Sequence, residues 1–196
     1  MEQFKNNNLI KTATLLPIID TLYAMGNLFV GITEDSWWFI LTGIYYIILS
    51  STRFTVLIIN KKQQNNFVPK FTGWMLMSTA IPLLGIALLS SVKDTGSKFH
   101  EIIMITIALY AFSKITLAII NSIKSRKNSD SLSKSLRSVS LATAFVSIAS
   151  LQRSMLVSFG DMSANEIRLF NSMTSIGVSL LVFFIGLLLF RSAQTK

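Results

Sequence analysis

Residues 53–60 read RFTVLIIN, and residues 114–121 read KITLAIIN. Both octapeptides follow the pattern basic-x-Thr-x-x-Ile-Ile-Asn, and the second begins 61 residues after the first. Each one closes an apolar segment and is followed by a run containing Lys and Asn. A cation within an apolar segment is costly in lipid. Its occurrence in both copies therefore predicts a repeated membrane architecture, with each octapeptide at the same end of a helix.

The composition indicates an integral membrane protein. Only 14% of the residues are charged, against roughly 25% in soluble domains, and the mean hydropathy is +0.56. The apolar residues fall into six blocks, at about 12–32, 37–60, 71–92, 99–121, 136–159 and 167–190. Each block is long enough to cross a hydrocarbon core of about 30 Å. We therefore expect an all-α fold of six transmembrane helices.

The loops divide the chain into three antiparallel helical hairpins, at about 1–65, 66–130 and 131–196, within a single integral membrane domain. The third hairpin lacks the octapeptide, because residues 182–190 are purely apolar. Two interpretations stay open: the hairpins are duplicated, or the shared pattern is a common type of helix end. The first block also follows a basic start, as a signal peptide would. Because Asp20 interrupts it and no clear cleavage site follows, we interpret it as a spanning helix.

Basic residues are distributed unequally between the two predicted sides of the membrane. One side holds twelve of them: Lys5, Lys11, Lys61, Lys62, Lys70, Lys124, Arg126, Lys127, Lys134, Arg137, Arg191 and Lys196. The other side holds three: Lys93, Lys98 and Arg168. Because cytoplasmic loops are enriched in Lys and Arg, both termini are predicted to be cytoplasmic. This distribution also explains the net charge of +9, so we expect the lipid bilayer as a partner and no nucleic acid.

No motif in the sequence indicates an enzyme. The chain has no cysteine and one histidine, so thiolate chemistry and His-based metal clusters are excluded. Walker, HExxH and GxSxG motifs do not occur. We expect neither a cofactor nor a catalytic site.

Three charged residues are predicted to lie at one depth in the membrane. Arg53 and Lys114 lie about seven residues from the cytoplasmic ends of their helices, or roughly 10 Å deep, and Asp20 falls in the same layer. One interpretation is an ion-paired cluster, either structural or part of a substrate or proton-coupling site. The other is that both cations extend their long stems to the cytoplasmic headgroups. Asp20 is too short to do so and needs a partner, for which Arg53 is nearest in sequence.

A second polar group is predicted toward the outer face. It comprises His100, Glu101, Gln152 and Arg153. Glu101 could pair with Arg153, and a histidine can titrate near physiological pH, although an interfacial role is more common. Trp37 and Trp38 begin the second block and are typical of interfacial anchors.

The fifth block carries hydroxyl groups at helical spacing. Ser140, Thr143, Ser147, Ser150 and Ser154 are separated by 3, 4, 3 and 4 residues, which places them on one helical face. Such a face fits a tight helix–helix seam, because small residues let backbones approach closely in lipid. The alternative is a polar pathway with Gln152 and Arg153 at its outer mouth.

Two segments of the chain resemble stretches of other proteins. Residues 136–156, LRSVSLATAFVSIASLQRSML, and residues 111–121, AFSKITLAIIN, are similar to stretches of uncharacterised membrane proteins of Gram-positive bacteria. The resemblance implies a multi-pass protein of the bacterial cytoplasmic membrane. It implies no activity and no functional residues.

Two functions are compatible with these patterns. The first is transport or channelling of a small solute through a polar seam between helices, for which the Asp20 layer should face a hydrated cavity. The second is an accessory or immunity-type subunit that packs against a partner. That role predicts a dry interior and an outer face of small residues. Either protein could be a homo-oligomer or bind another membrane protein.

Overall fold

The computed structural model describes residues 2–33, 35–61, 67–92, 101–125, 131–159 and 162–194. They form six α-helices, and the prediction of an all-helical fold is confirmed for this part of the chain. The helices are α1 (Glu2–Thr33), α2 (Trp37–Lys61), α3 (Phe67–Val92), α4 (Glu101–Ser125), α5 (Ser131–Phe159) and α6 (Ala164–Ser192).

Five helices are long and apolar enough to cross a membrane, and α4 differs from them. The five segments are Leu16–Thr33, Trp37–Ile59, Phe67–Val92, Ser131–Val157 and Ala164–Ser192. In α4 the described apolar stretch is shorter, at Ala108–Ile120. The described helices thus have the character of a multi-pass membrane protein, while the sixth span stays a prediction.

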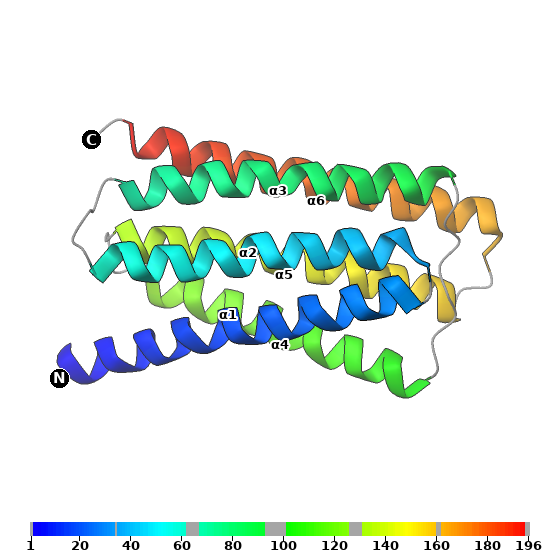
Figure 1. Cartoon of the computed structure of the whole chain (residues 1–196). Coiled ribbons are helices and arrows are strands. Elements are labelled where there is room, and N and C mark those ends of the chain that lie inside the picture. The colour runs from blue at the N-terminus through cyan, green and yellow to red at the C-terminus, as the bar shows by residue number, and fades with distance from the viewer. Residues whose placement is uncertain are drawn as a thin grey trace.

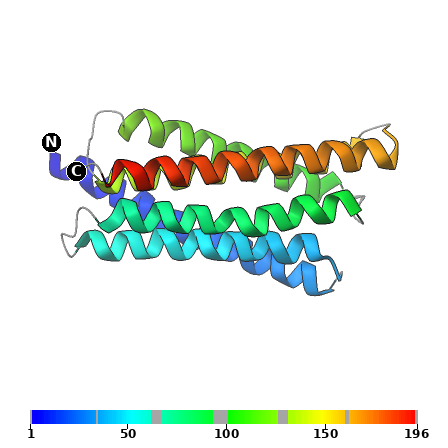
Figure 2. The ribbon, with the colours of Figure 1, turned by 90° about the horizontal axis from the view of Figure 1, so that it is seen from above.

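The helices form an elongated bundle in which the start of α1 and the end of α6 lie at the same end (Figure 1). The helix pairs that share the most extensive contacts are α3 with α6, α1 with α2, and α4 with α5. The first predicted hairpin therefore corresponds to packed neighbours. The second predicted hairpin differs, because Figures 1 and 2 place α4 away from α3. Helix α3 packs chiefly against α6, and α4 against α5, and both partners belong to the third predicted hairpin.

Two glycines explain why α3 packs so closely on α6. A Cβ added to Gly73 would lie 2.7 Å from the Gly186 carbonyl oxygen, and one added to Gly186 would lie 2.8 Å from the Gly73 carbonyl oxygen. The two backbones are therefore in direct contact at this crossing. In lipid, the hydrophobic effect does not drive helices together, because acyl chains are as apolar as the helix surfaces. Close packing of this kind stabilises the helix pair instead.

Bulky apolar side chains cover the outside of the bundle. On α1 they recur at helical spacing, and on α3 and α6 they are equally large. Examples are Ile18, Leu22, Met25 and Phe29 on α1, Trp74, Ile81 and Leu88 on α3, and Met173, Leu180, Phe184 and Leu188 on α6. A surface of this kind suits contact with lipid.

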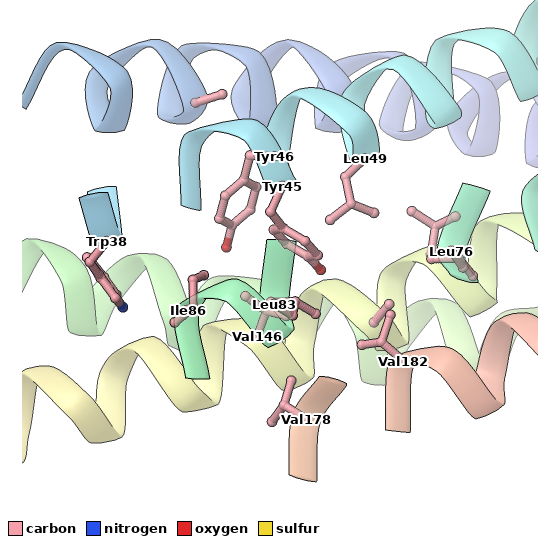
Figure 3. Close-up of a cluster of buried hydrophobic side chains, with 13 residues drawn as sticks. Trp38, Tyr45, Tyr46, Leu49, Leu76, Leu83, Ile86, Val146, Val178 and Val182 are labelled. Carbon is pink, nitrogen blue, oxygen red and sulfur yellow. The ribbon is translucent and has the colours of Figure 1, made fainter. Parts of the chain in front are cut away.

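The interior combines apolar side chains with polar ones. Figure 3 shows the apolar cluster, in which Tyr45, Tyr46 and Leu49 of α2 meet Leu76 of α3 and Val182 of α6. The same interior holds the charged residues Asp20, Arg53, Lys114 and Arg153. Because isolated charges are not tolerated in such a setting, their contacts define the candidate site.

Candidate functional site

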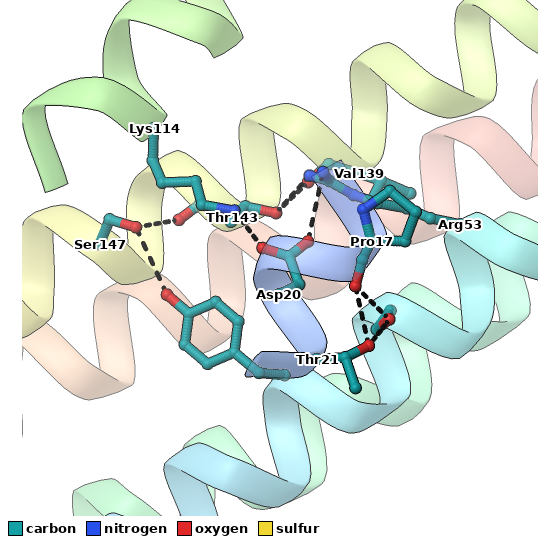
Figure 4. Close-up of polar contacts among 10 residues, drawn as sticks. Pro17, Asp20, Thr21, Arg53, Lys114, Val139, Thr143 and Ser147 are labelled. Carbon is teal, nitrogen blue, oxygen red and sulfur yellow. Dashed lines mark hydrogen bonds and ion pairs between the residues drawn. The ribbon is translucent and has the colours of Figure 1, made fainter. Parts of the chain in front are cut away.

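A single carboxylate bridges two cations between α1, α2 and α4 (Figure 4). Asp20 Oδ2 lies 3.2 Å from Arg53 Nη1, and Asp20 Oδ1 accepts a hydrogen bond from Lys114 Nζ. Asp20 is 0% exposed, Arg53 2% and Lys114 5%. The structure thus brings together all three residues of the predicted layer, from α1, α2 and α4, in what we call the charged cluster.

Helix α5 contributes a fourth side to the charged cluster. Arg53 Nη2 donates a hydrogen bond of 3.0 Å to Thr143 Oγ1, which itself donates to the Val139 carbonyl at 2.8 Å (Figure 4). Buried ion pairs persist only where such additional hydrogen bonds help to offset the loss of water. The cluster therefore ties four helices together.

The burial of these cations contradicts the interpretation that they extend to the cytoplasmic headgroups. The side chains of Arg53 and Lys114 end inside the bundle, because the counter-charge of Asp20 lies there. Reasoning from depth alone could not detect this, because it placed the residues along the helix axis but not around it. The sequence singled out Arg53 as the nearest candidate partner of Asp20, and in the structure Lys114 contacts Asp20 as well.

Tyrosine rings from three helices line the charged cluster, and the sequence analysis missed them. Lys114 Nζ lies 5.1 Å from the centre of the Tyr110 ring, within the range of a cation–π interaction. The Tyr110 ring stacks on Tyr23 at 4.1 Å, and Tyr23 meets Tyr46 edge-on at 4.8 Å. A usable signal was present: these tyrosines lie within apolar segments, whereas membrane proteins concentrate tyrosine at segment ends.

The predicted hydroxyl face of α5 points into the bundle. Ser140, Thr143, Ser147 and Ser154 are buried, and Ser150 is half-buried. Three of these hydroxyls donate to carbonyls one turn earlier in α5: Thr143 to Val139, Ser147 to Thr143 and Ser154 to Ser150. Across the interface, Ser147 Oγ lies 3.4 Å from the Tyr46 hydroxyl. The face thus meets polar groups of α2.

Gln152 and Arg153 have separate partners. Gln152 and Thr174 exchange two hydrogen bonds, of 2.7 and 3.0 Å, which join α5 to α6. Arg153 donates to Ser90 Oγ at 3.3 Å and stacks on Trp38, with 4.6 Å from its guanidinium carbon to the ring centre. His100 and the side chain of Glu101 lie outside the described residues, so the predicted Glu101–Arg153 pair stays a prediction.

Trp38 does not act as the predicted interfacial anchor. Its side chain is buried against Arg153, whereas the adjacent Trp37 is 63% exposed. Successive residues of a helix point in directions about 100° apart, so one indole can face outward while the next faces the core. Only Trp37 is exposed as an anchor would be.

A small cavity of about 30 Å³ lies between α2, α3, α5 and α6, and we call it the polar cavity. Its polar lining residues are Thr42, Tyr45, Ser150, Arg153, Asn171, Thr174 and Ser175. Trp38, Leu83, Ile86, Val146 and Val178, labelled in Figure 3, form much of its apolar wall. No member of the charged cluster lines it. Tyr45, however, packs edge-on against Tyr46, with 5.1 Å between the ring centres, and Tyr46 is one of the tyrosines around the charged cluster.

Asn171 and Thr42 are lining residues that the sequence analysis did not identify. Both are almost fully buried, and neither has a hydrogen-bond partner for its side chain. An asparagine in the first half of an apolar segment was a detectable signal. A threonine in such a segment was not, because most threonines there bond to their own helix, as Thr52 and Thr72 do.

The charged cluster and the polar cavity offer cations, hydroxyls and one carboxylate. The described residues contain no group of three or more His, Cys, Asp or Glu side chains that could hold a metal ion. No protein family, curated protein or solved structure matches the chain. Inferences about function therefore depend on the geometry of these two sites.

Proposed function

We propose that the protein is a six-span protein of the bacterial cell membrane, with cytoplasmic termini, that transports or channels a small solute through its polar interior. The observation that carries the proposal is the position of the α5 hydroxyl face. Thr143 contacts the charged cluster, and Ser150, about 10 Å further along the helix at 1.5 Å per residue, lines the polar cavity. Between them, Ser147 contacts Tyr46.

The charged cluster supports this function because ionisable groups within the membrane are costly. They usually lie on ion or substrate pathways. A purely structural tie between four helices could be made from apolar side chains, often at equal or greater stability. Asp20, Arg53 and Lys114 are better explained if their charges act on a solute.

The alternative of an accessory or immunity-type subunit has less support. That role predicts a dry interior and an outer face of small residues. The interior holds the polar cavity, and most of the exposed side chains of α1, α3 and α6 are large and apolar. Both features favour transport, with lipid on the outside and polar groups within.

Solute flux into proteoliposomes tests the proposal. We expect purified wild-type protein to carry at least one class of small ion or polar solute. Asp20→Asn should reduce the rate at least about tenfold, because it leaves two buried cations without their carboxylate. Thr143→Val is a milder variant that keeps all charges, and it should also slow flux. Thr72→Val, on α3 and bonded only within its own helix, should leave flux unchanged.

Folding of each variant is checked by size-exclusion chromatography and circular dichroism before reconstitution. If correctly folded wild-type protein carries no inorganic cation, inorganic anion or small neutral solute, the transport proposal is wrong.

A further inference from the structure

The polar cavity contains buried polar groups that no protein atom satisfies. Thr42 Oγ1, the Tyr45 hydroxyl and both amide atoms of Asn171 have no hydrogen-bond partner in the protein. These side chains belong to residues that are 1%, 0% and 3% exposed. Buried polar groups cost free energy unless they are bonded, and in native proteins nearly all of them are. Three such residues around one cavity offer hydrogen bonds that a small bound ligand could complete.

The lining of the polar cavity is rich in hydrogen-bond donors and includes one cationic side chain. The Thr42 and Tyr45 hydroxyls and the Asn171 amide can all donate. The guanidinium of Arg153 also lines the cavity while it contacts Ser90 and Trp38. The lining residues include no Asp or Glu. A guanidinium repels a cation, and together with these donors it can recognise an anion.

The charged cluster adds to the positive potential beyond Tyr45. It contains two cations, Arg53 and Lys114, and one carboxylate, Asp20. When all three are ionised, one positive charge is in excess. In a surrounding of low dielectric constant, this excess attracts an anion over a longer distance than it would in water.

The volume limits the ligand to a small one. A single water-sized sphere needs roughly 10–15 Å³ of such space, so about 30 Å³ holds two or three of them. Pockets for organic ligands of drug size are about 300–1,000 Å³. We propose that the polar cavity is a binding site for a small monovalent inorganic anion, such as chloride or nitrate. This inference rests on the proposed function, in which that anion is the transported solute.

Thermal unfolding in detergent tests binding without transport. Chloride or nitrate replaces gluconate at constant ionic strength, because gluconate is too large for the cavity. A ligand at a hundred times its dissociation constant should raise the wild-type melting temperature by roughly 5–11 °C. Thr42→Val and Asn171→Leu should abolish this rise, since each removes a donor while it keeps the number of side-chain heavy atoms.

Two controls keep the binding test independent of folding. Thr72→Val makes the same change as Thr42→Val at another buried threonine, outside the cavity, and should retain the full rise. In gluconate alone, Thr42→Val and Asn171→Leu should be at least as stable as wild type, because they remove unpaired buried polar groups. A wild-type melting temperature that does not respond to either anion means that water alone fills the cavity, and it overturns the anion site.

Flux measurements separate this inference from the proposed function. Chloride or nitrate flux that Asn171→Leu reduces at least about tenfold supports both. Anion-dependent stabilisation without any flux keeps the site and overturns transport. Flux of a cation or neutral solute that Asn171→Leu leaves unchanged, without anion-dependent stabilisation, overturns the anion site and keeps transport.

Discussion

Asp20 directs its two carboxylate oxygens at different cations, Oδ2 at Arg53 and Oδ1 at Lys114. It is therefore the member of the charged cluster that neither of the others can replace. Loss of Asp20 leaves two buried cations facing each other. Loss of Lys114 leaves an Asp20–Arg53 pair of zero net charge, and Arg53 still donates a hydrogen bond to Thr143. The three residues should therefore differ sharply in their contribution to stability.

Asp20→Asn should lower the free energy of unfolding by about 3–5 kcal/mol, the usual cost of breaking a buried ion pair on one side. Lys114→Met should cost less than half as much, because methionine fills the space of the lysine stem and the remaining pair is balanced. Thermal or denaturant unfolding in detergent measures both.

Lys70→Met is the matched control, since Lys70 is exposed on α3. It should change the free energy of unfolding by no more than about 0.5 kcal/mol. If Lys114→Met destabilises the protein as much as Asp20→Asn, the two cations are not held by one shared carboxylate.

At the scale of the helices, the α3–α6 crossing depends on two glycines. A methyl group on Gly73 or Gly186 would overlap a carbonyl oxygen of the facing helix, which cannot rotate away. Gly73→Ala and Gly186→Ala should each destabilise the protein by about 1–3 kcal/mol, the range for overpacked positions. Thermal unfolding of the purified variants measures the effect.

Gly177, also on α6, provides the control. A Cβ added there would have no atom of another helix within 4 Å, so Gly177→Ala should be neutral or stabilising by up to about 1 kcal/mol. Equal destabilisation by Gly177→Ala and Gly186→Ala would show that the backbone contact at the crossing is not the cause, because helix propensity favours alanine at both positions.

The helices themselves could be predicted from the sequence, whereas their partners could not. Apolar blocks of about 20 residues are a strong signal because lipid satisfies no backbone hydrogen bond. Which helices touch depends on short-range contacts such as Gly73 on Gly186, between residues more than 100 positions apart. The predicted hairpin of α3 and α4 assumed that consecutive helices pack together, and these two have other main partners.

The candidate site was predictable to the extent that its residues are unusual for a membrane segment. A charged residue such as Asp20 is conspicuous in an apolar block, and so is the period of the α5 hydroxyls. The polar cavity could not be foreseen from Asn171 alone, although an asparagine is unusual in an apolar segment. Thr42 and Tyr45 are ordinary residue types there, and they become significant only because their side chains have no partner in the protein.

For the whole molecule, the number of spans and the positions of the termini are linked. If α4 crosses the membrane as the sixth span, both termini lie on the same side. If α4 does not cross, an odd number of spans puts them on opposite sides. The arrangement in Figure 1, where α4 runs alongside α5 within the bundle, favours six spans.

Reporter fusions test this topology. A reporter active only in the cytoplasm should work when fused before Met1 and also when fused after Lys196. A reporter active only outside the cell should fail at both positions. Activity of the external reporter after Lys196 alone would show that the termini lie on opposite sides and that six spans is wrong.

Single-cysteine substitution along α5 tests the central claim, a polar pathway through the molecule, most directly. The chain has no cysteine, so every reaction reports the introduced thiol. In proteoliposomes, Ser147→Cys, Ser150→Cys and Ser154→Cys should react with a small water-soluble methanethiosulfonate at least about tenfold faster than Ile148→Cys and Met155→Cys, which replace exposed apolar residues. If the three serine positions react no faster than the two apolar ones, the hydroxyl face is a dry packing seam and the pathway does not exist.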